Sequence, residues 1–188
     1  DTGTATPLSN AATILSYPVT LRDNNRLPGL DFALLDRLCA GLGEPVVELP
    51  TAVGFCMAIK RACLDEVGVF DAERFGRGYG EENDFCLRAT AAGWRHVAAT
   101  NLFVWHQGGG SFGPEREVRL ADALVTIGQL HPEYGTLVQS FIRRDPLQPV
   151  RAALDAARIR ADPRPKFLCL GKEVETNGRS EDVVALAL

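Results

Sequence analysis

The chain has 188 residues, of which 46% are hydrophobic and 23% are charged, and its formal net charge is −4. This composition is typical of a soluble globular protein with a sizeable buried core. The acidic balance argues against a nucleic-acid surface, because phosphate binding requires a basic patch. No apolar run approaches the roughly 18 residues needed to cross a bilayer, so we expect no transmembrane segment.

The five cysteines lie inside apolar stretches, and none has the C-x-x-C spacing of a zinc site or a thioredoxin-like pair. We therefore expect small buried thiols in a reducing cytosol. The chain opens with "DTGTATPLSN" and has no initiator methionine, which suggests a segment of a longer protein.

The first part of the chain mixes strand and helix patterns. Residues 4–18 indicate a short strand followed by a loop, and apolar residues at helical spacing indicate a helix over 30–42. The dense apolar run 53–59 predicts a buried strand, and 60–70 predicts one or two helical turns. Residues 71–80 are rich in glycine and predict a loop.

A second helix is predicted over 82–92, where Gly93 would end it, and a β-type run follows over 96–106. After a flexible loop at 107–113 the composition becomes helical. Three further helices are expected between the prolines, at 115–130, 133–143 and 147–160.

The loop-to-helix junction "GRGYGEENDFCLRATAAGWRHV" (76–97) gathers unusual negative charge behind three glycines. A carboxylate in the first turn of a helix is stabilised by the free N–H groups there, by about 0.3–1 kcal/mol. Capping therefore explains one or two acids, but Glu81, Glu82 and Asp84 would repel one another. That repulsion favours a nearby cation or substrate hydroxyl, and both the capping and the functional interpretations stay open.

Glycines 76, 78 and 80 would let the backbone approach a ligand closely. Arg88 follows Asp84 by four residues, a helical spacing at which it would hold that carboxylate in place. This leaves Glu82 as the candidate base and Asp84 as a structural anchor.

A second motif, "FVWHQGGGSFG", places His106 at the end of an apolar strand and before three glycines. The residues alone allow a rim histidine without function, a metal ligand, or a contact to a phosphate wrapped by glycine amides. His96 and His131 have no comparable surroundings, and we interpret both as ordinary.

With these motifs, the sequence resembles glycosyltransferase family 2, the inverting nucleotide-sugar transferases of the GT-A fold. The similarity runs through "TPLSNAATILSYP", "PTAVGFCMAIKRACLDEVGVFDAERFGRGYGEENDFCLRATAAGW" and "FVWHQGGGSFG", about residues 4–113. It is strongest to bacterial polysaccharide transferases, including rhamnosyltransferase-like proteins. It implies an α/β fold, with a Rossmann-like mixed sheet flanked by helices, in which 1–113 is the acceptor-side, C-terminal half of a GT-A domain. Residues 114–165 would form a helical extension. From composition alone we favour 166–188 as the start of a second α/β domain, although this segment could also pack back on the first domain.

The resemblance also implies site roles. In the family, an acidic residue at this junction deprotonates the acceptor hydroxyl, and the matching residue is Glu82, with Glu81 and Asp84 beside it. His106 would help to bind a divalent cation, Mg²⁺ or Mn²⁺. The implied substrate-binding residues are Gly54, Phe55, Gly80, Arg88, Trp105, Gly109 and Ser111.

The implied reaction moves a sugar from a nucleotide-sugar donor to a saccharide or lipid-linked saccharide acceptor, in the cytoplasm or peripherally at the inner face of the membrane. The family's nucleotide-binding half and its Asp-x-Asp metal motif would precede "TPLSN", and this sequence contains no Asp-x-Asp. Two alternatives stay open: a non-catalytic sugar-binding or scaffold module on the same fold, and a metal-dependent hydrolase that uses Glu82 and His106.

Overall fold

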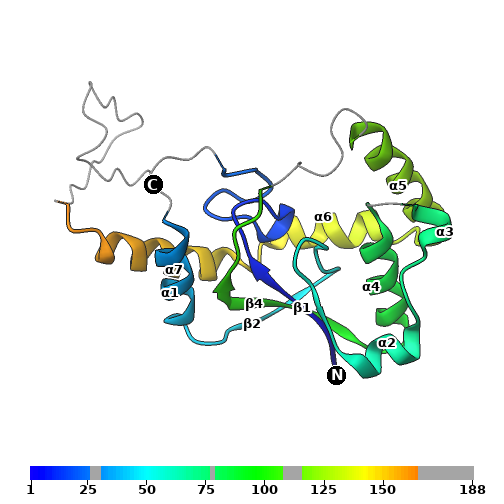
Figure 1. The fold of residues 1–188 in the computed structure, drawn as a ribbon, viewed down its shortest axis with the longest axis horizontal. Coiled ribbons are helices and arrows are strands. Elements are labelled where there is room, and N and C mark those ends of the chain that lie inside the picture. The colour runs from blue at the N-terminus through cyan, green and yellow to red at the C-terminus, as the bar shows by residue number, and fades with distance from the viewer. Residues whose placement is uncertain (26–30, 77–78, 108–115, 165–188) are drawn as a thin grey trace.

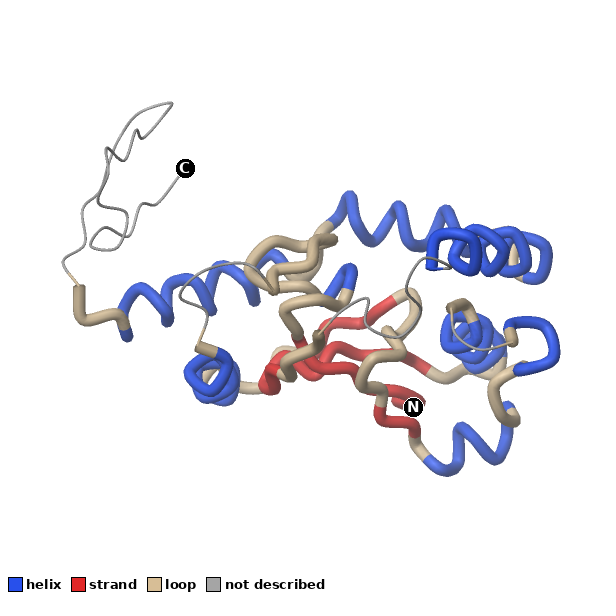
Figure 2. Tube along the Cα trace, turned by 45° about the horizontal axis from the view of Figure 1, so that its top comes forward, coloured by secondary structure: helices blue, strands red, loops and turns tan. Residues whose placement is uncertain are grey.

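The structure is a computed structural model that describes residues 1–25, 31–76, 79–107 and 116–164. A mixed sheet of four strands lies in the middle of the molecule, and helices flank it (Figures 1 and 2). The predicted α/β class, with a mixed sheet flanked by helices, is therefore confirmed. In the described part of the chain, no helix has both the length and the apolar character needed to cross a membrane.

The sheet has the strand order β2–β4–β1–β3. The strands are β1 (Thr2–Leu8), β2 (Val46–Leu49), β3 (Ala58–Ile59) and β4 (Arg95–Phe103). β1 and β4 are parallel, whereas β2 pairs antiparallel with β4 and β3 pairs antiparallel with β1. Because β1 and β4 are parallel neighbours, the loops that follow them emerge at the same edge of the sheet, where ligands bind in open α/β sheets.

The helices predicted at 30–42, 82–92, 115–130, 133–143 and 147–160 are all present, and their observed ends lie within two residues of the predicted ones. The observed helices are η1 (Thr13–Leu15), α1 (Phe32–Ala40), α2 (Arg61–Val67), α3 (Ala72–Phe75), α4 (Glu81–Ala91), α5 (Arg116–Leu130), α6 (Tyr134–Arg144) and α7 (Gln148–Ala161). α1 packs against β4 and α7, while α2 packs against β1 and α4 (Figure 1). α5 contacts α3, α4 and α6, so the end of α4 that carries the acids lies beside the helical extension.

Two predictions for the region before α4 are wrong. Only the last two residues of the apolar run 53–59 form a strand. Its side chains divide between two cores instead, because Val53 and Phe55 pack on one buried cluster and Met57 and Ile59 on the other. The glycine-rich segment 71–80 contains the short helix α3, which begins where the Asp71 carboxylate accepts a hydrogen bond from the Arg74 N–H at 3.0 Å.

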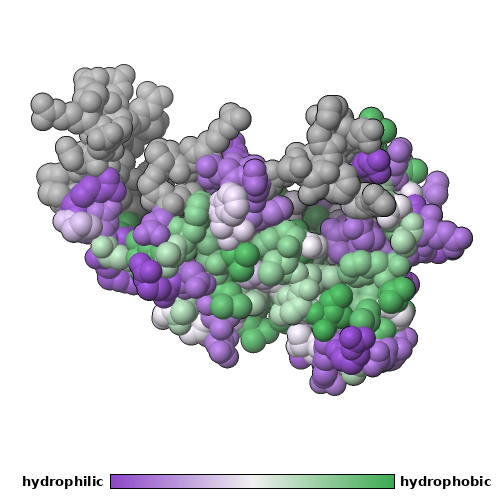
Figure 3. All heavy atoms as spheres, in the orientation of Figure 1, coloured by the Kyte–Doolittle hydropathy of each residue, from purple (hydrophilic) through white to green (hydrophobic). Residues whose placement is uncertain are grey.

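The larger core joins the helical extension to the strands. Leu8 and Tyr17 pack there with Phe141 and Leu154, which come from α6 and α7. The buried Tyr17 hydroxyl donates to Asp155 Oδ1 at 2.5 Å and accepts from Arg158 Nη1 at 3.0 Å, which fixes α7 to the loop after β1. The face in Figure 3 shows hydrophobic surface over the middle of the molecule, between hydrophilic ends.

The thiols are only partly as expected. Cys39, Cys63 and Cys86 are buried, but Cys56 is exposed because it lies in the irregular segment before β3. Burial raises the pKa of the Cys39 and Cys86 thiols to about 12, so both are neutral core groups. Cys169 and the predicted domain start at 166–188 lie outside the described residues.

Candidate functional site

The acidic helix α4 begins at a turn that requires glycine. Gly80 has a φ of 94°, in the left-handed region, and a Cβ there would come within 2.9 Å of the Phe75 ring. No side chain of the preceding residue caps this helix. Instead the Gly80 N–H donates to Glu82 Oε2 at 3.2 Å, so the Glu82 carboxylate folds back over the free N–H groups of the helix start.

Glu82 is partly buried and lies against the backbone of Gly54. A Cβ built on Gly54 would be 3.4 Å from both Cγ and Cδ of Glu82. Burial raises the pKa of Glu82 above its usual range, and repulsion from Glu81 adds to that rise. Backbone N–H groups, including those of Gly80 and Gly54, partly oppose it. A carboxylate with a raised pKa is suited to accept a proton near neutral pH.

Glu81 and Tyr134 lie close to the same carboxylate. Glu81 Oε2 is buried and has no hydrogen-bond partner among the described residues. Tyr134, the first residue of α6, has a raised phenol pKa because of burial and then because of the charge on Glu82. No sequence pattern indicated that the helical extension would supply a side chain to this group.

His106 is fixed by the loop after β1. Its backbone N–H donates to Asn10 Oδ1 at 2.8 Å, and Asn10 Nδ2 donates back to the His106 carbonyl at 2.7 Å. Its ring Nδ1 is 2.6 Å from the Ala11 carbonyl oxygen, which assigns the proton to Nδ1 and the free lone pair to Nε2. The ring also stacks on Phe55, with 5.1 Å between the two centroids and 23° between the planes.

The two sequence motifs therefore meet on one short segment. Gly54 contacts Glu82, and its neighbour Phe55 stacks on His106. We call this group, formed by Gly54, Phe55, Gly80, Glu82 and His106, the Glu82–His106 site. It brings together five of the residues predicted from the sequence.

The described residues do not by themselves form a metal site. A backbone carbonyl on Nδ1 leaves His106 Nε2 oriented as in metal-ligating histidines. However, no group of three or more histidine, cysteine or acidic side chains that could hold an ion occurs in the described part of the chain. Mg²⁺ or Mn²⁺ therefore stays a prediction from the sequence, with His106 as its candidate ligand among the described residues.

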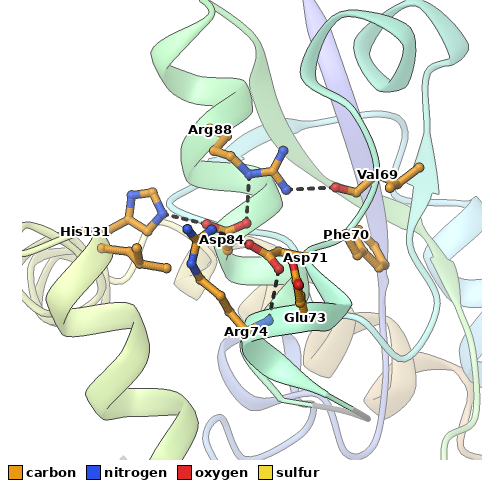
Figure 4. A pocket seen from close by; sticks show the side chains of 9 residues that line it. Val69, Phe70, Asp71, Glu73, Arg74, Asp84, Arg88 and His131 are labelled. Atoms are coloured by element: carbon orange, nitrogen blue, oxygen red, sulfur yellow. Dashed lines mark hydrogen bonds and ion pairs between the residues drawn. The ribbon is translucent and has the colours of Figure 1, made fainter.

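Asp84 lies between the side chains of Arg88 and His131 (Figure 4). Its side chain is 5% exposed; Oδ2 accepts from Arg88 Nε at 2.8 Å, and Oδ1 lies 2.9 Å from His131 Nε2. Arg88 also donates to the carbonyls of Val67 and Val69, at 2.8 and 3.0 Å. The predicted Asp84–Arg88 pair is confirmed, and the contact of His131 with Asp84 is one that the sequence did not indicate.

A cavity of about 520 Å³ opens beside this cluster, lined by charged side chains and by apolar ones that include Phe70 and Leu130. Figure 4 shows Asp71 and Arg74, which pair with each other at 2.5 Å, across from Asp84. A second cavity of about 480 Å³ lies between β2 and α6. Among their described lining residues, neither includes Glu82 or His106.

The remaining predicted residues are separate from the Glu82–His106 site or fall beyond the described part of the chain. Trp105 is 48% exposed and packs on Phe32, with 6.1 Å between the ring centroids. Gly109 and Ser111 lie outside the described residues. His96 is a core residue, as interpreted from the sequence: it is buried, and burial lowers the pKa of its imidazole.

Comparison with known proteins identifies no relative. No family model, no curated protein and no solved structure matches the chain. Support for the α/β architecture and for the grouping of Glu82 with His106 therefore comes from this chain alone.

Proposed function

We propose that the chain is the acceptor-side catalytic part of an inverting glycosyltransferase of the GT-A fold. It would move a sugar from a nucleotide-sugar donor to a hydroxyl of a saccharide or lipid-linked saccharide, in the cytoplasm or at the inner face of the membrane. The observation that supports this most is the contact of Glu82 and His106 with the adjacent residues Gly54 and Phe55. Two motifs that resemble the same family thus form one site.

In the proposed step, Glu82 takes the proton from the acceptor hydroxyl while that oxygen attacks the anomeric carbon. The new carbon–oxygen bond forms as the bond from the anomeric carbon to the diphosphate breaks, and the nucleoside diphosphate leaves with the electron pair. Attack from the face opposite the leaving group inverts the anomeric configuration. A positioned general base typically contributes about 10²–10⁴-fold to such a rate.

The surroundings of Glu82 suit an acceptor sugar. Gly54 has no side chain, so Glu82 can lie close against its backbone, and the stacked rings of Phe55 and His106 offer an apolar surface next to polar groups. A divalent cation, Mg²⁺ or Mn²⁺, would neutralise the leaving diphosphate when bound. His106 is its candidate ligand among the described residues, and the role of Glu82 as base does not depend on that ion.

The direct test is the Glu82→Gln variant of the full-length protein, assayed with nucleoside-diphosphate sugars and saccharide acceptors. We expect transfer to fall about 10²–10⁴-fold while the protein remains folded, because the amide keeps the shape but cannot accept the proton. Glu73→Gln, an exposed carboxylate on α3, is the matched control and should retain wild-type transfer. Wild-type turnover in Glu82→Gln would exclude Glu82 as the base.

Calorimetry with the same sugars separates the enzyme from the non-catalytic alternative. Saccharide binding by the wild-type protein, without nucleotide-sugar binding and without turnover, would favour a sugar-binding or scaffold module on this fold.

A further inference from the structure

His131 comes from the turn between α5 and α6, outside the segment that carries the family resemblance. Its side chain is 15% exposed, and its Nε2 lies 2.9 Å from Asp84 Oδ1. We infer that His131 is a positioning residue for Glu82, which it orients through Asp84 and the first turn of α4. This inference rests on the proposed role of Glu82.

The first turn of α4 connects the two acids mechanically. The Asp84 backbone N–H donates to the Gly80 carbonyl at 2.8 Å, which closes the first helical hydrogen bond. The Gly80 N–H in turn donates to Glu82 Oε2. A displacement of Asp84 is therefore transmitted through Gly80 to the carboxylate of Glu82, at a helix start where Gly80 offers no side-chain cap.

His131 and Arg88 connect this turn to two different parts of the chain. The Arg88–Asp84 pair lies within α4, so on its own it moves with the helix. Arg88 links the pair to the carbonyls of Val67 and Val69, ahead of α3. His131 alone among the described partners of Asp84 links it to the helical extension.

The same turn of the extension reaches both acids. The Tyr134 N–H donates to the His131 carbonyl at 3.0 Å, so the two residues are held as a unit. Tyr134 then lies near Glu82, as the effect of the Glu82 charge on its phenol indicates, while His131 contacts Asp84. The α5–α6 turn thus contacts the first turn of α4 beside both carboxylates.

The contact does not require a charged histidine. An imidazole with its proton on Nε2 donates to Asp84 Oδ1 in the neutral form as well as in the charged form. The inference therefore concerns orientation, and the amide of glutamine should replace the imidazole as a donor.

The test compares His131→Ala and His131→Gln in the full-length protein by following the titration of the Glu82 side-chain carboxyl carbon by NMR. We expect the midpoint in His131→Ala to shift toward the ordinary glutamate range, because a loosened helix start lets water reach the carboxylate. His131→Gln should restore most of the wild-type midpoint. Arg151→Ala is the control, because it breaks an ion pair with Asp145 elsewhere in the extension and should leave Glu82 unchanged.

In the transfer assay, we expect His131→Ala to lower kcat about tenfold with KM changed less than about twofold, since misplacement of a base affects the chemical step. If His131→Ala is unfolded by circular dichroism, His131→Phe keeps a ring without a donor and takes its place. An unchanged Glu82 titration in these variants would overturn the inference, whether or not transfer is observed. If the Glu82 titration shifts in the His131 variants but the wild-type protein transfers no sugar, the positioning role of His131 stands and the proposed function is refuted.

Discussion

Two carboxylates in the first turn of α4 have opposite surroundings. Asp84 is nearly inaccessible to solvent and is paired with a guanidinium and an imidazole. Glu82 accepts hydrogen bonds from backbone N–H groups, but burial, together with repulsion from its neighbour Glu81, raises its pKa. The Arg88 guanidinium supports Asp84 as a structural group, whereas burial without such a cation among the described contacts supports the proposed role of Glu82 as a proton acceptor.

The comparison shows how one short acidic stretch can serve two purposes. Acids at a helix start are usually explained by capping, and here Glu82 does accept the Gly80 N–H. The two acids differ in the neighbours that they meet on their side of the helix. Glu82 faces the segment at Gly54, and Asp84 faces the α5–α6 turn.

The largest expected effect is a loss of unfolding free energy in the Asp84→Ala variant, which tests whether Asp84 is a structural anchor. Removal of this carboxylate leaves Arg88 without its partner, and breaking a buried pair on one side costs roughly 3 kcal/mol of unfolding free energy. Urea denaturation measures the loss. A change as small as that of the control Asp65→Ala, which removes an exposed ion pair with Arg61, would show that Asp84 is not an anchor.

Gly54→Ala probes the other side of the helix. The new methyl group would lie 3.4 Å from the Glu82 side chain, at the close limit of ordinary contact, and would shift the carboxylate slightly, so we expect transfer to slow severalfold with little change in stability. Steady-state kinetics provides the measurement. Gly135→Ala on α6 is the matched control, because nothing lies within 4 Å of a Cβ there and its activity should be unchanged.

The smallest expected effect is a stability difference that depends on pH. Because the pKa of Glu82 is raised in the folded state, its stabilising contribution is present below the unfolded pKa and is lost as pH rises through the folded pKa. Glu82→Gln should therefore unfold at a higher urea concentration than wild type at pH 7. The gain should disappear in acid; a gain that persists there would contradict a raised pKa.

The sequence predicted the features that depend on local spacing. The bounds of α1 and α4, the Asp84–Arg88 pair at i, i+4 and the place of His106 after a strand all follow from periodicities within one element. These are the interactions that a helix or strand creates without knowledge of its neighbours.

The rest depended on tertiary contacts that no local pattern encodes. His131 meets Asp84 across 47 positions of the chain, and only the packing of α5 on α4 brings them together. The run 53–59 looked like a strand because apolar periodicity does not reveal that its side chains divide between two cores. The polar side chains of His131, Glu133 and Tyr134 in the turn between α5 and α6 carry no local pattern that names their partners.

The pH dependence of kcat/KM for sugar transfer tests the central claim most directly, because it reports the ionisation of the free enzyme's base. With Glu82 as that base, the rate should fall in acid with a midpoint clearly above the ordinary glutamate value of about 4.3, and Glu82→Gln should abolish that limb together with the activity. An acid limb that persists unchanged in an active Glu82→Gln enzyme would contradict the account.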